Sequence, residues 1–460
     1  MIEEFDDVVL GGGKGGKSLA MALANAGHRV ALIEKGQIGG SCINVACIPT
    51  KTMVASVKLI ELASRADEFG VALRPAESSI AGIVERKRRV VGGMIDTHWK
   101  LFTGTPNMAF LLGTGKFLAD RTIEVALDGG SKRVVRGKRV YINTGSHTTI
   151  PPIPGLDTVN YLTSTSVMEL EELPARLIIV GAGYIALEFA QVFRRLGSDV
   201  VVVGRGERFL PNEDSDIAAE IRKVLEEDGI EFLDGAETTA VGATTTGVEL
   251  AYTRQADSGS LHGSHLMLAV GRTPNTAGLG LEVTGVEVGP RGGVVVNDRL
   301  ETTAANIYAI GDCNGGPLFT HVSWDDYRIL LANVLHDAQR STSSRLVPYT
   351  LFIDPELGRV GLTEEQATAQ GYDVATATLP ADKIPRANTA GETQGVLKAV
   401  IDRKTSQILG CSLFCHSAGE VMSVVQMAML GNVPYTQVRD TVFTHPTMAE
   451  SLNLLFAGVS

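Results

Sequence analysis

The sequence predicts an α/β protein in which one strand–turn–helix–strand unit occurs twice and an α+β domain follows at the C-terminus. Three observations support this prediction. A glycine-rich stretch, GGGKGGKS, occupies residues 11–18, its surrounding pattern returns 170 residues later, and the pattern changes after the Ser-rich stretch 340–345. In both copies an apolar strand precedes the glycines and an amphipathic helix follows them, which is the order of a βαβ unit.

The first glycine-rich stretch satisfies two different phosphate-binding patterns. As G-x-x-x-x-G-K-S it is a P-loop that ends in Lys17 and Ser18. As G-x-G-x-x-G it is a dinucleotide-binding turn made by Gly11, Gly13 and Gly16. Both patterns place a phosphate on the exposed amides of a helix N-terminus, so the glycine-rich stretch alone does not separate them. The second strand that follows, ending in Glu34, favours the dinucleotide pattern.

The second copy decides between these patterns. Gly181 and Gly183 align with the first two glycines, and Ala186 takes the third position, as the dinucleotide pattern allows. Leu187 and Glu188 stand where a P-loop needs Lys and Ser. We therefore predict two dinucleotide-binding (Rossmann-like) folds, and the Lys-Ser pair of the first copy becomes part of an early helical turn.

The two copies differ at the end of their second strand. The first copy ends in Glu34, at the distance where a carboxylate binds a ribose 2′-hydroxyl. The second copy has Gly204 there, followed by Arg205 and then Arg208. An arginine attracts a 2′-phosphate and an acid repels it. The first fold is therefore expected to bind FAD and the second to prefer NADPH to NADH, unless the two arginines are ordinary surface residues.

A close cysteine pair follows the first fold, in GGSCINVACIPTK at residues 39–51. In a regular helix the Cα atoms of Cys42 and Cys47 would lie about 8–9 Å apart, whereas a disulfide needs less than about 7 Å. A bond between them requires an irregular helix start, which the preceding glycines and the following Pro49 favour. Two buried structural thiols or half of a zinc site are the alternatives. The sequence has no second pair at zinc spacing, so we expect no metal site.

This cysteine segment resembles the redox motif of the flavoprotein disulfide reductases, the class I pyridine nucleotide-disulfide oxidoreductases that include glutathione reductase, lipoamide dehydrogenase and mercuric reductase. The resemblance extends through the chain. Further segments are similar to the family's two domain crossovers, its second flavin motif and its C-terminal active-site motif: 141–146 with 153–155, 269–275, 307–312 and 445–450.

The resemblance implies a role for each matching residue. In the redox centre, Cys47 is the charge-transfer thiol, Cys42 the interchange thiol, and Lys51 and Glu188 an ion pair near the flavin. Tyr184 covers the nicotinamide pocket. His445 is the acid–base, held by Glu450, and it reaches across a homodimer interface. The remaining cofactor-binding positions are Gly40, Ser41, Thr144, Gly145, Gly271 and Asp312.

The chemistry that these residues would perform is thiol–disulfide exchange. It needs a thiolate to attack and an acid to protonate the leaving sulfur. His445, with a carboxylate five residues later, has the composition of such an acid. Taken alone it is more typical of a core or surface histidine, and the cysteine pair is what raises its significance.

The same motifs predict the domain organisation. We expect the flavin domain at residues 1–148 and 271–345, the nicotinamide domain at 149–270, and an α+β dimerisation domain at 346–460. Cys411 and Cys415 fall in the last domain and are interpreted as inert buried thiols, although a second redox pair is an alternative. Cys313 is interpreted as a packing residue.

Composition excludes several classes of protein. The net charge of −11 and the absence of a basic stripe argue against nucleic-acid binding. The sequence has no run of about 18 apolar residues, so we expect no membrane span. The acidic N-terminus lacks a signal-peptide core. Five cysteines in 460 residues are too few for a disulfide scaffold. We therefore expect a cytoplasmic enzyme.

The electron acceptor is the least determined feature of the sequence. The segments 319–328 and 383–386 most resemble the mercuric-reductase-like branch, which includes a bacterial copper(II) reductase, while the NADPH motif resembles that of glutathione reductase. The final residues, 455–460, lack the cysteine pair of mercuric reductase. We expect a small disulfide or a metal ion such as mercuric or copper(II) as acceptor. A dihydrolipoamide dehydrogenase-like enzyme and a non-catalytic flavin redox sensor are the alternatives.

Overall fold

The computed structural model describes residues 1–73 and 79–459, which form two compact units. The first unit comprises 1–52, 85–149 and 271–345, and the second comprises 53–84, 150–270 and 346–460. Three of the changes between units lie within two residues of a predicted domain boundary. The segment 53–84, which the prediction assigned to the flavin domain, belongs to the second unit. The predicted nicotinamide and dimerisation domains also lie together in the second unit.

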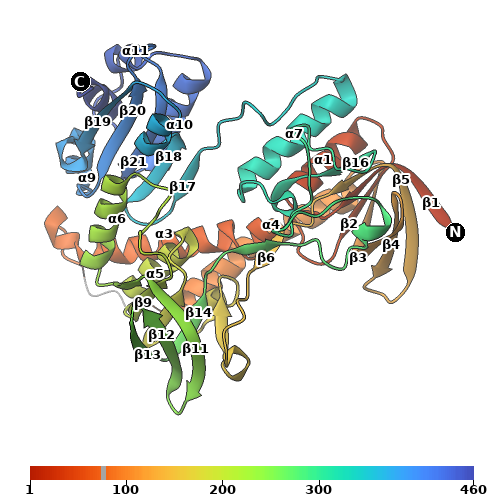
Figure 1. The fold of residues 1–460 in the computed structure, drawn as a ribbon, viewed down its shortest axis with the longest axis horizontal. Helices are drawn as coiled ribbons and strands as arrows, with labels where there is room; N and C mark the ends of the chain where they lie inside the picture. Colours follow the sequence, from red (N-terminus) through yellow and green to blue (C-terminus); the bar gives the residue numbers. More distant parts are fainter. Residues whose placement is uncertain (74–78, 460) are drawn as a thin grey trace. The chain divides into compact units, whose positions relative to one another are not determined.

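The first unit is built around a six-stranded sheet (Figure 1). Its strands are β1 (Ile2–Leu10), β2 (Val30–Glu34), β3 (Met108–Ala119), β4 (Thr122–Leu127), β5 (Lys132–Ile142) and β16 (Ile307–Ala309). Strand β1 pairs in parallel with both β2 and β5, while β3, β4 and β5 form an antiparallel meander. A short antiparallel pair, β6 (Ser146–Thr148) with β15 (Arg272–Pro274), lies where the chain leaves this unit after residue 149 and returns to it at residue 271.

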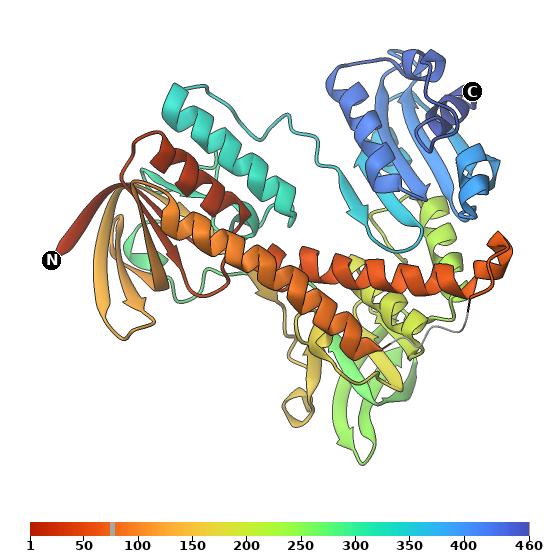
Figure 2. The same cartoon turned by 180° about the vertical axis from the view of Figure 1, so that it is seen from behind.

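Two helices of the first unit lie side by side against its sheet, α1 (Lys14–Asn25) and α7 (Thr320–His336), as Figure 2 shows from behind. Gly15 permits their close approach, because a Cβ there would lie 2.5 Å from the Ser323 carbonyl oxygen. Apolar residues of α1 and α7 form one core with β1 and β2. The N-terminal turns of both helices therefore lie close to each other, beside the first glycine-rich turn.

The second unit contains the repeated nucleotide-binding fold. Its parallel sheet has the order β10-β9-β8-β14-β7. The strands are β7 (Tyr161–Thr163), β8 (Arg176–Val180), β9 (Asp199–Gly204), β10 (Glu231–Asp234) and β14 (His265–Leu268), with helices α5 (Tyr184–Leu196) and α6 (Ser215–Glu227). An antiparallel sheet of β11 (Ala236–Thr244), β12 (Gly247–Arg254) and β13 (Asp257–Gly263) is inserted before β14.

The C-terminal part of the second unit is an antiparallel five-stranded sheet of order β17-β18-β21-β20-β19. Its strands are β17 (Tyr349–Leu351), β18 (Glu356–Gly361), β19 (Val374–Pro380), β20 (Val396–Asp402) and β21 (Ile408–Cys415). Its helices are α8 (Glu364–Ala369), α9 (Pro385–Ala390), α10 (Ala418–Leu430), α11 (Tyr435–Asp440) and α12 (Ser451–Ala457). The predicted fold class, α/β with a C-terminal α+β domain, is confirmed.

Three further helices are α2 (Ser41–Asn44), α3 (Cys47–Ser64) and α4 (Ile80–Gly104). Helix α2 lies in the first unit, whereas α3 and α4 each continue from one unit into the other. By length and composition alone, residues 41–64 are apolar enough to cross a membrane. However, Lys58 of this segment donates to Asp354 of the second unit at 2.8 Å, and Met53 and Val57 belong to the core of that unit. Because these contacts are those of a packed helix, we interpret the segment as part of the folded protein.

Candidate active site

The first glycine turn joins β1 to α1 in a conformation that side chains would block. Gly11 has a φ of +110°, and a Cβ there would lie 2.1 Å from the Asn143 carbonyl oxygen. The N-cap of α1 is Gly13, and the Gly16 amide donates to the Asn143 side chain at 2.8 Å. Asn143 in turn donates to the Ile310 carbonyl oxygen at 2.8 Å. The loop is thereby anchored to the residues that directly follow β5 and β16.

Glu34 lies at the end of β2, buried, with its carboxylate against the same turn. It accepts hydrogen bonds from the amides of Gly12 at 2.8 Å and of Gly36 and Gln37, each at 2.9 Å. Three backbone donors fix both oxygens, and a carboxylate has about four acceptor sites. One acceptor site therefore remains for a ribose hydroxyl, the ligand that the sequence predicts for Glu34.

The other predicted flavin positions lie around this turn. A Cβ on Gly40 would lie 2.5 Å from the Gly13 Cα atom, so α2, which begins at Ser41, starts directly against the N-terminus of α1. Asp312 accepts from the Ser146 hydroxyl at 2.5 Å, and Thr144 donates to the Asn275 carbonyl oxygen at 2.6 Å. Gly145 and Gly271 both have positive φ values and accept from the amides of residues 275 and 149.

This cradle fits a flavin dinucleotide. Side chains are missing where Gly11, Gly13 and Gly40 bring three backbone segments together, and the helix N-terminus supplies amide donors for a pyrophosphate. The Glu34 carboxylate accepts from the Gly12 amide of the first glycine turn, and Asp312 lies in the short helical turn Gly311–Asn314. Each group comes from the first unit.

The cysteine pair spans a break between two helices. Helix α2 ends at Asn44, Val45 leaves the helical conformation with φ −143°, and α3 begins at Cys47. The irregular helix predicted for a bonded pair is thus confirmed. Here the two cysteines are free thiols, and they interact with each other through a hydrogen bond.

The pair is electrostatically asymmetric. The hydrogen bond from Cys42 lowers the pKa of the Cys47 thiol, and Thr320, 3.2 Å from the Cys47 sulfur, and the charge of Lys51 lower it further. The same hydrogen bond and burial raise the pKa of Cys42. Cys47 is therefore the thiolate and Cys42 the protonated partner, which is the distribution that the predicted charge-transfer and interchange roles require.

The second glycine turn repeats the first. Gly181 has a φ of +110°, and a Cβ there would lie 2.3 Å from the Ala269 carbonyl oxygen. Gly183 is the N-cap of α5, and an added Cβ would meet nothing within 4 Å, which leaves open space for a ligand at this helix N-terminus. Glu188, one turn into α5, is buried and accepts from the Phe352 amide at 3.0 Å.

Tyr184 is held at the start of α5 by a buried acid that the sequence did not reveal. Its hydroxyl donates to Glu213, which also accepts from the Tyr349 hydroxyl at 2.7 Å. The two tyrosine rings lie 5.6 Å apart, and the Arg359 guanidinium donates to the Tyr349 oxygen at 2.7 Å. Burial and the Glu213 charge raise the pKa of Tyr184, so its phenol stays protonated.

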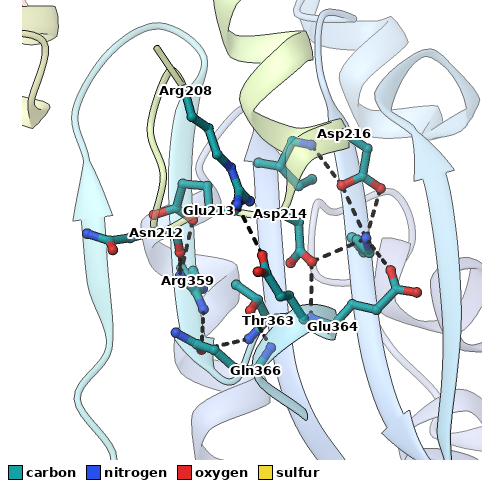
Figure 3. A network of polar contacts seen from close by, with 12 residues as sticks. Arg208, Asn212, Glu213, Asp214, Asp216, Arg359, Thr363, Glu364 and Gln366 are labelled. Carbon is teal, nitrogen blue, oxygen red and sulfur yellow. Dashed lines mark hydrogen bonds and ion pairs between the residues drawn. The ribbon is translucent and has the colours of Figure 1, made fainter. Parts of the chain in front are cut away.

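The two predicted phosphate-binding arginines lie after β9. Arg205 is exposed in the turn. Arg208 donates to the Glu365 carboxylate at 3.1 Å and to the Glu213 carbonyl oxygen at 3.2 Å (Figure 3). Lys398 lies in the same network, and its ammonium pairs with Asp214, Asp216 and Glu364. The arginines are thus both solvent-accessible, and one of them is tied to the loop that holds Tyr184.

The C-terminal motif forms a histidine–carboxylate pair. His445 Nδ1 donates to Glu450, with both carboxylate oxygens at 2.9 Å. The His445 side chain is 65% exposed. With Nδ1 occupied by the carboxylate, Nε2 is the ring nitrogen that can give or accept a proton, as an acid–base requires.

The other three cysteines are buried, as predicted. Burial raises the pKa of Cys313 and of Cys415 to about 12 and raises that of Cys411 as well, so these thiols are unreactive. Among residues 1–73 and 79–459, no group of three or more His, Cys, Asp or Glu side chains is arranged to hold a metal ion.

Two glycine-cradled nucleotide folds and an activated cysteine pair define an oxidoreductase, and the comparison with known families agrees. Residues 5–326 match the family described as "Pyridine nucleotide-disulphide oxidoreductase", and residues 347–455 match its dimerisation domain. The chain therefore belongs to this family, whose flavoprotein disulfide reductases use FAD and a pyridine nucleotide.

Particular relatives narrow the comparison. The chain is 39% identical over 462 residues to "Probable pyridine nucleotide-disulfide oxidoreductase RclA" of Escherichia coli, covering 100% of both proteins. It is 35% identical to mercuric reductase of Bacillus cereus, covering 98% of the chain and 71% of the relative. The solved "Cu(II) complex of HOCl-induced flavoprotein disulfide reductase RclA" from E. coli superposes with a TM-score of 0.91 over 99% of each chain, at 39% identity.

Proposed function

We propose that this protein is an FAD-dependent NADPH oxidoreductase that passes electrons through Cys42 and Cys47 to a metal ion or a small disulfide. The observation that carries the proposal is the asymmetric cysteine pair beside the flavin cradle in the first unit. When bound, FAD would supply two-electron transfer between the nucleotide and the cysteine pair. The backbone at Gly11, Gly13 and Gly40, with Glu34, would hold it.

The chain's own residues account for disulfide exchange. Once the Cys42–Cys47 bond is reduced, Cys42 loses its proton and attacks one sulfur of the acceptor. A mixed disulfide forms, and the first acceptor thiolate leaves with a proton from a histidine. The Cys47 thiolate then attacks the Cys42 sulfur, so the internal disulfide reforms and the second acceptor thiolate departs. The acceptor gains two electrons, and the cysteine pair loses two.

A metal ion is favoured as acceptor by the relatives. One solved relative is a Cu(II) complex, and several curated relatives are mercuric reductases. A thiophilic ion would receive electrons from the same reduced pair, because soft thiolates suit such metals. A small disulfide remains the second candidate, since Cys42 is placed as an exchange thiol.

An anaerobic acceptor screen tests the proposal. NADPH or NADH is mixed with Cu(II), Hg(II), glutathione disulfide or lipoamide, and nucleotide oxidation is followed with wild type and with the double variant Cys42→Ser/Cys47→Ser. We expect turnover with at least one acceptor that the double variant lacks. Equal rates in both proteins for every acceptor would contradict the proposal and favour a flavin redox sensor.

We also propose that the active site is completed in a homodimer, with the partner subunit's His445 as the acid. The dimerisation-domain match and the exposed His445–Glu450 pair support this arrangement. Mixing inactive Cys42→Ser and His445→Ala proteins under subunit exchange should restore part of the activity, because half of the sites in heterodimers are wild type. Verified exchange without recovery would place His445 in its own chain's site or outside catalysis. A cytoplasmic location remains a prediction from the sequence.

A further inference from the structure

Three segments of the first unit converge on the interchange cysteine. Lys17 lies in the first turn of α1, and its side chain is buried against His98 of α4. The close approach of Gly40 to Gly13 brings the start of α2, and therefore Cys42, against this turn. The residue before Gly40 also approaches α4, because a Cβ on Gly39 would lie 3.3 Å from the His98 ring. Lysine, histidine and thiol thus share one small region.

The hydrogen bonds around His98 fix the direction of the Lys17 contact. His98 Nδ1 lies 2.7 Å from the Met94 carbonyl oxygen, so it must carry the proton and donate. In the neutral ring, Nε2 is then an acceptor, and the Lys17 ammonium donates to it. Burial and the nearby lysines lower the pKa of His98, in agreement with a neutral ring.

Lys17 is an unusual residue for this position. It is 6% exposed, and within the described part of the chain no carboxylate forms an ion pair with it. Removing an ammonium from water without an opposite charge is costly. Burial lowers its pKa to about 8, while its interaction with Cys42 acts in the opposite direction. A lysine that packs merely as a hydrophobic stem would extend its ammonium to solvent.

The groups around Cys42 show what this charge can do. The hydrogen bond with Cys47 and burial raise the pKa of Cys42, whereas Thr320 and Lys17 lower it. Lys14 lowers the pKa of Lys17, and both lysines lower the pKa of His98. Lys51 lowers the pKa of Cys47. Lys17 is therefore the cation that opposes the retention of the Cys42 proton. In the second copy, which has no thiol, the equivalent residue is the uncharged Leu187.

We propose that Lys17, held by His98, is a positioning residue that stabilises the Cys42 thiolate during attack on the acceptor. This inference rests on the proposed function, in which Cys42 is the interchange thiol. It also gives a role to the lysine of the first glycine-rich stretch. In a P-loop this lysine would contact a phosphate, whereas here it stabilises the thiolate of Cys42.

The test measures thiol ionisation and needs no acceptor or turnover. In FAD-loaded Cys47→Ser protein, the rate of Cys42 alkylation by iodoacetamide is measured from pH 6 to pH 10. Adding Lys17→Leu should lower the rate at pH 7 about five- to thirtyfold, because a nearby cation favours the thiolate. The difference in alkylation rate between the proteins with and without Lys17→Leu should become smaller toward pH 10. Lys17→Arg should restore the rate to within about threefold, because the charge is kept.

Lys14→Met is the matched control, because it removes a cation from the same helical turn. Lys14 lies over the Trp324 ring, 5.0 Å from its centroid. Its loss should change the alkylation rate less than about twofold. Flavin content verifies folding, and Lys17→Gln replaces Lys17→Leu if the latter loses FAD. An unchanged profile in the neutral Lys17 variant, or an equal loss in Lys14→Met, would overturn the proposal. Failure of the acceptor screen would leave this measurement unaffected.

Discussion

The two nucleotide-binding turns share a backbone and differ in the side chains that close around it. Gly11 and Gly181 have the same φ of +110°, and each amide donates at 2.8 Å to the strand that follows the helix. In both turns an added Cβ would strike a backbone carbonyl. The glycine pattern therefore specifies the path of the chain and says little about which nucleotide is bound.

The two turns differ at two neighbouring positions: where one position has a larger side chain, the other is glycine. In the first copy Glu34 covers the Gly12 amide, and a Cβ on Gly12 would lie 3.2 Å from the carboxylate. In the second copy Ala182 replaces that glycine, and Gly204 replaces the acid, which leaves room beside the alanine methyl group. With the same backbone, the acid of the first copy and the glycine of the second are therefore predicted to favour different nucleotides.

The largest expected effect tests whether acceptor reduction depends on the cysteine pair that follows the first nucleotide-binding fold. Cys42→Ser should abolish acceptor reduction, by at least about a thousandfold, because no exchange thiol remains. It should leave reduction of the flavin by NADPH intact, and Cys47 should give a long-wavelength charge-transfer band with oxidised flavin.

The matched variant is Cys47→Ser, which should lose activity equally and show no such band. Absorbance spectra and stopped-flow reduction distinguish the two proteins. A band in Cys47→Ser and none in Cys42→Ser would reverse the assignment of the two thiols.

A second pair of variants breaks each turn separately. Gly11→Ala should reduce flavin content to less than about a tenth, since the substitution is strained at this φ and collides with a carbonyl oxygen. Gly181→Ala should retain flavin and lose its reduction by NADPH. Gly92→Ala is the control, because its Cβ would meet nothing within 4 Å. Normal flavin content in Gly11→Ala would contradict the structural role of that turn.

The third prediction concerns Arg205, which directly follows the glycine that replaces the acid. Arg205→Ala should lower kcat/KM for NADPH about ten- to a hundredfold and change that for NADH much less, since a charge-assisted contact to the 2′-phosphate is worth about 1.5–3 kcal/mol. Steady-state kinetics with both nucleotides provide the measurement. A wild type that uses NADH better than NADPH would refute the preference outright.

The smallest effect is on the charge of Cys47. Its pKa is lowered to about 6, so the charge-transfer absorbance of the reduced protein should persist at pH 7 and disappear as the pH falls through about 6. Thr320→Val removes a hydroxyl that donates to the thiolate, which should raise this midpoint by up to about one unit. Thr320→Ser should retain the wild-type value. An identical midpoint in the valine variant would exclude a contribution from the hydroxyl.

Short-range patterns made much of the site predictable. The glycine spacing, the Cys42–Cys47 pair and the His445–Glu450 pair each fall within six residues, where backbone geometry limits what neighbours can do. Their partners were not predictable. Thr320 is 273 residues from Cys47, and Glu213 contacts Tyr184 and Tyr349 from a loop with no motif of its own. Asn143 lay inside a recognised segment, yet its bond to Gly16 required the folded sheet.

By itself the sequence determined the duplicated fold, the family and the thiols that we propose as the redox pair, because glycine conformation and residue spacing are local properties. Only the tertiary structure decided which groups set the charge of those thiols. Lys17 reads as an ordinary helix residue until α1, α2 and α4 converge on Cys42. The strength of a charge depends on burial and on neighbours far along the chain, and these exist only after folding.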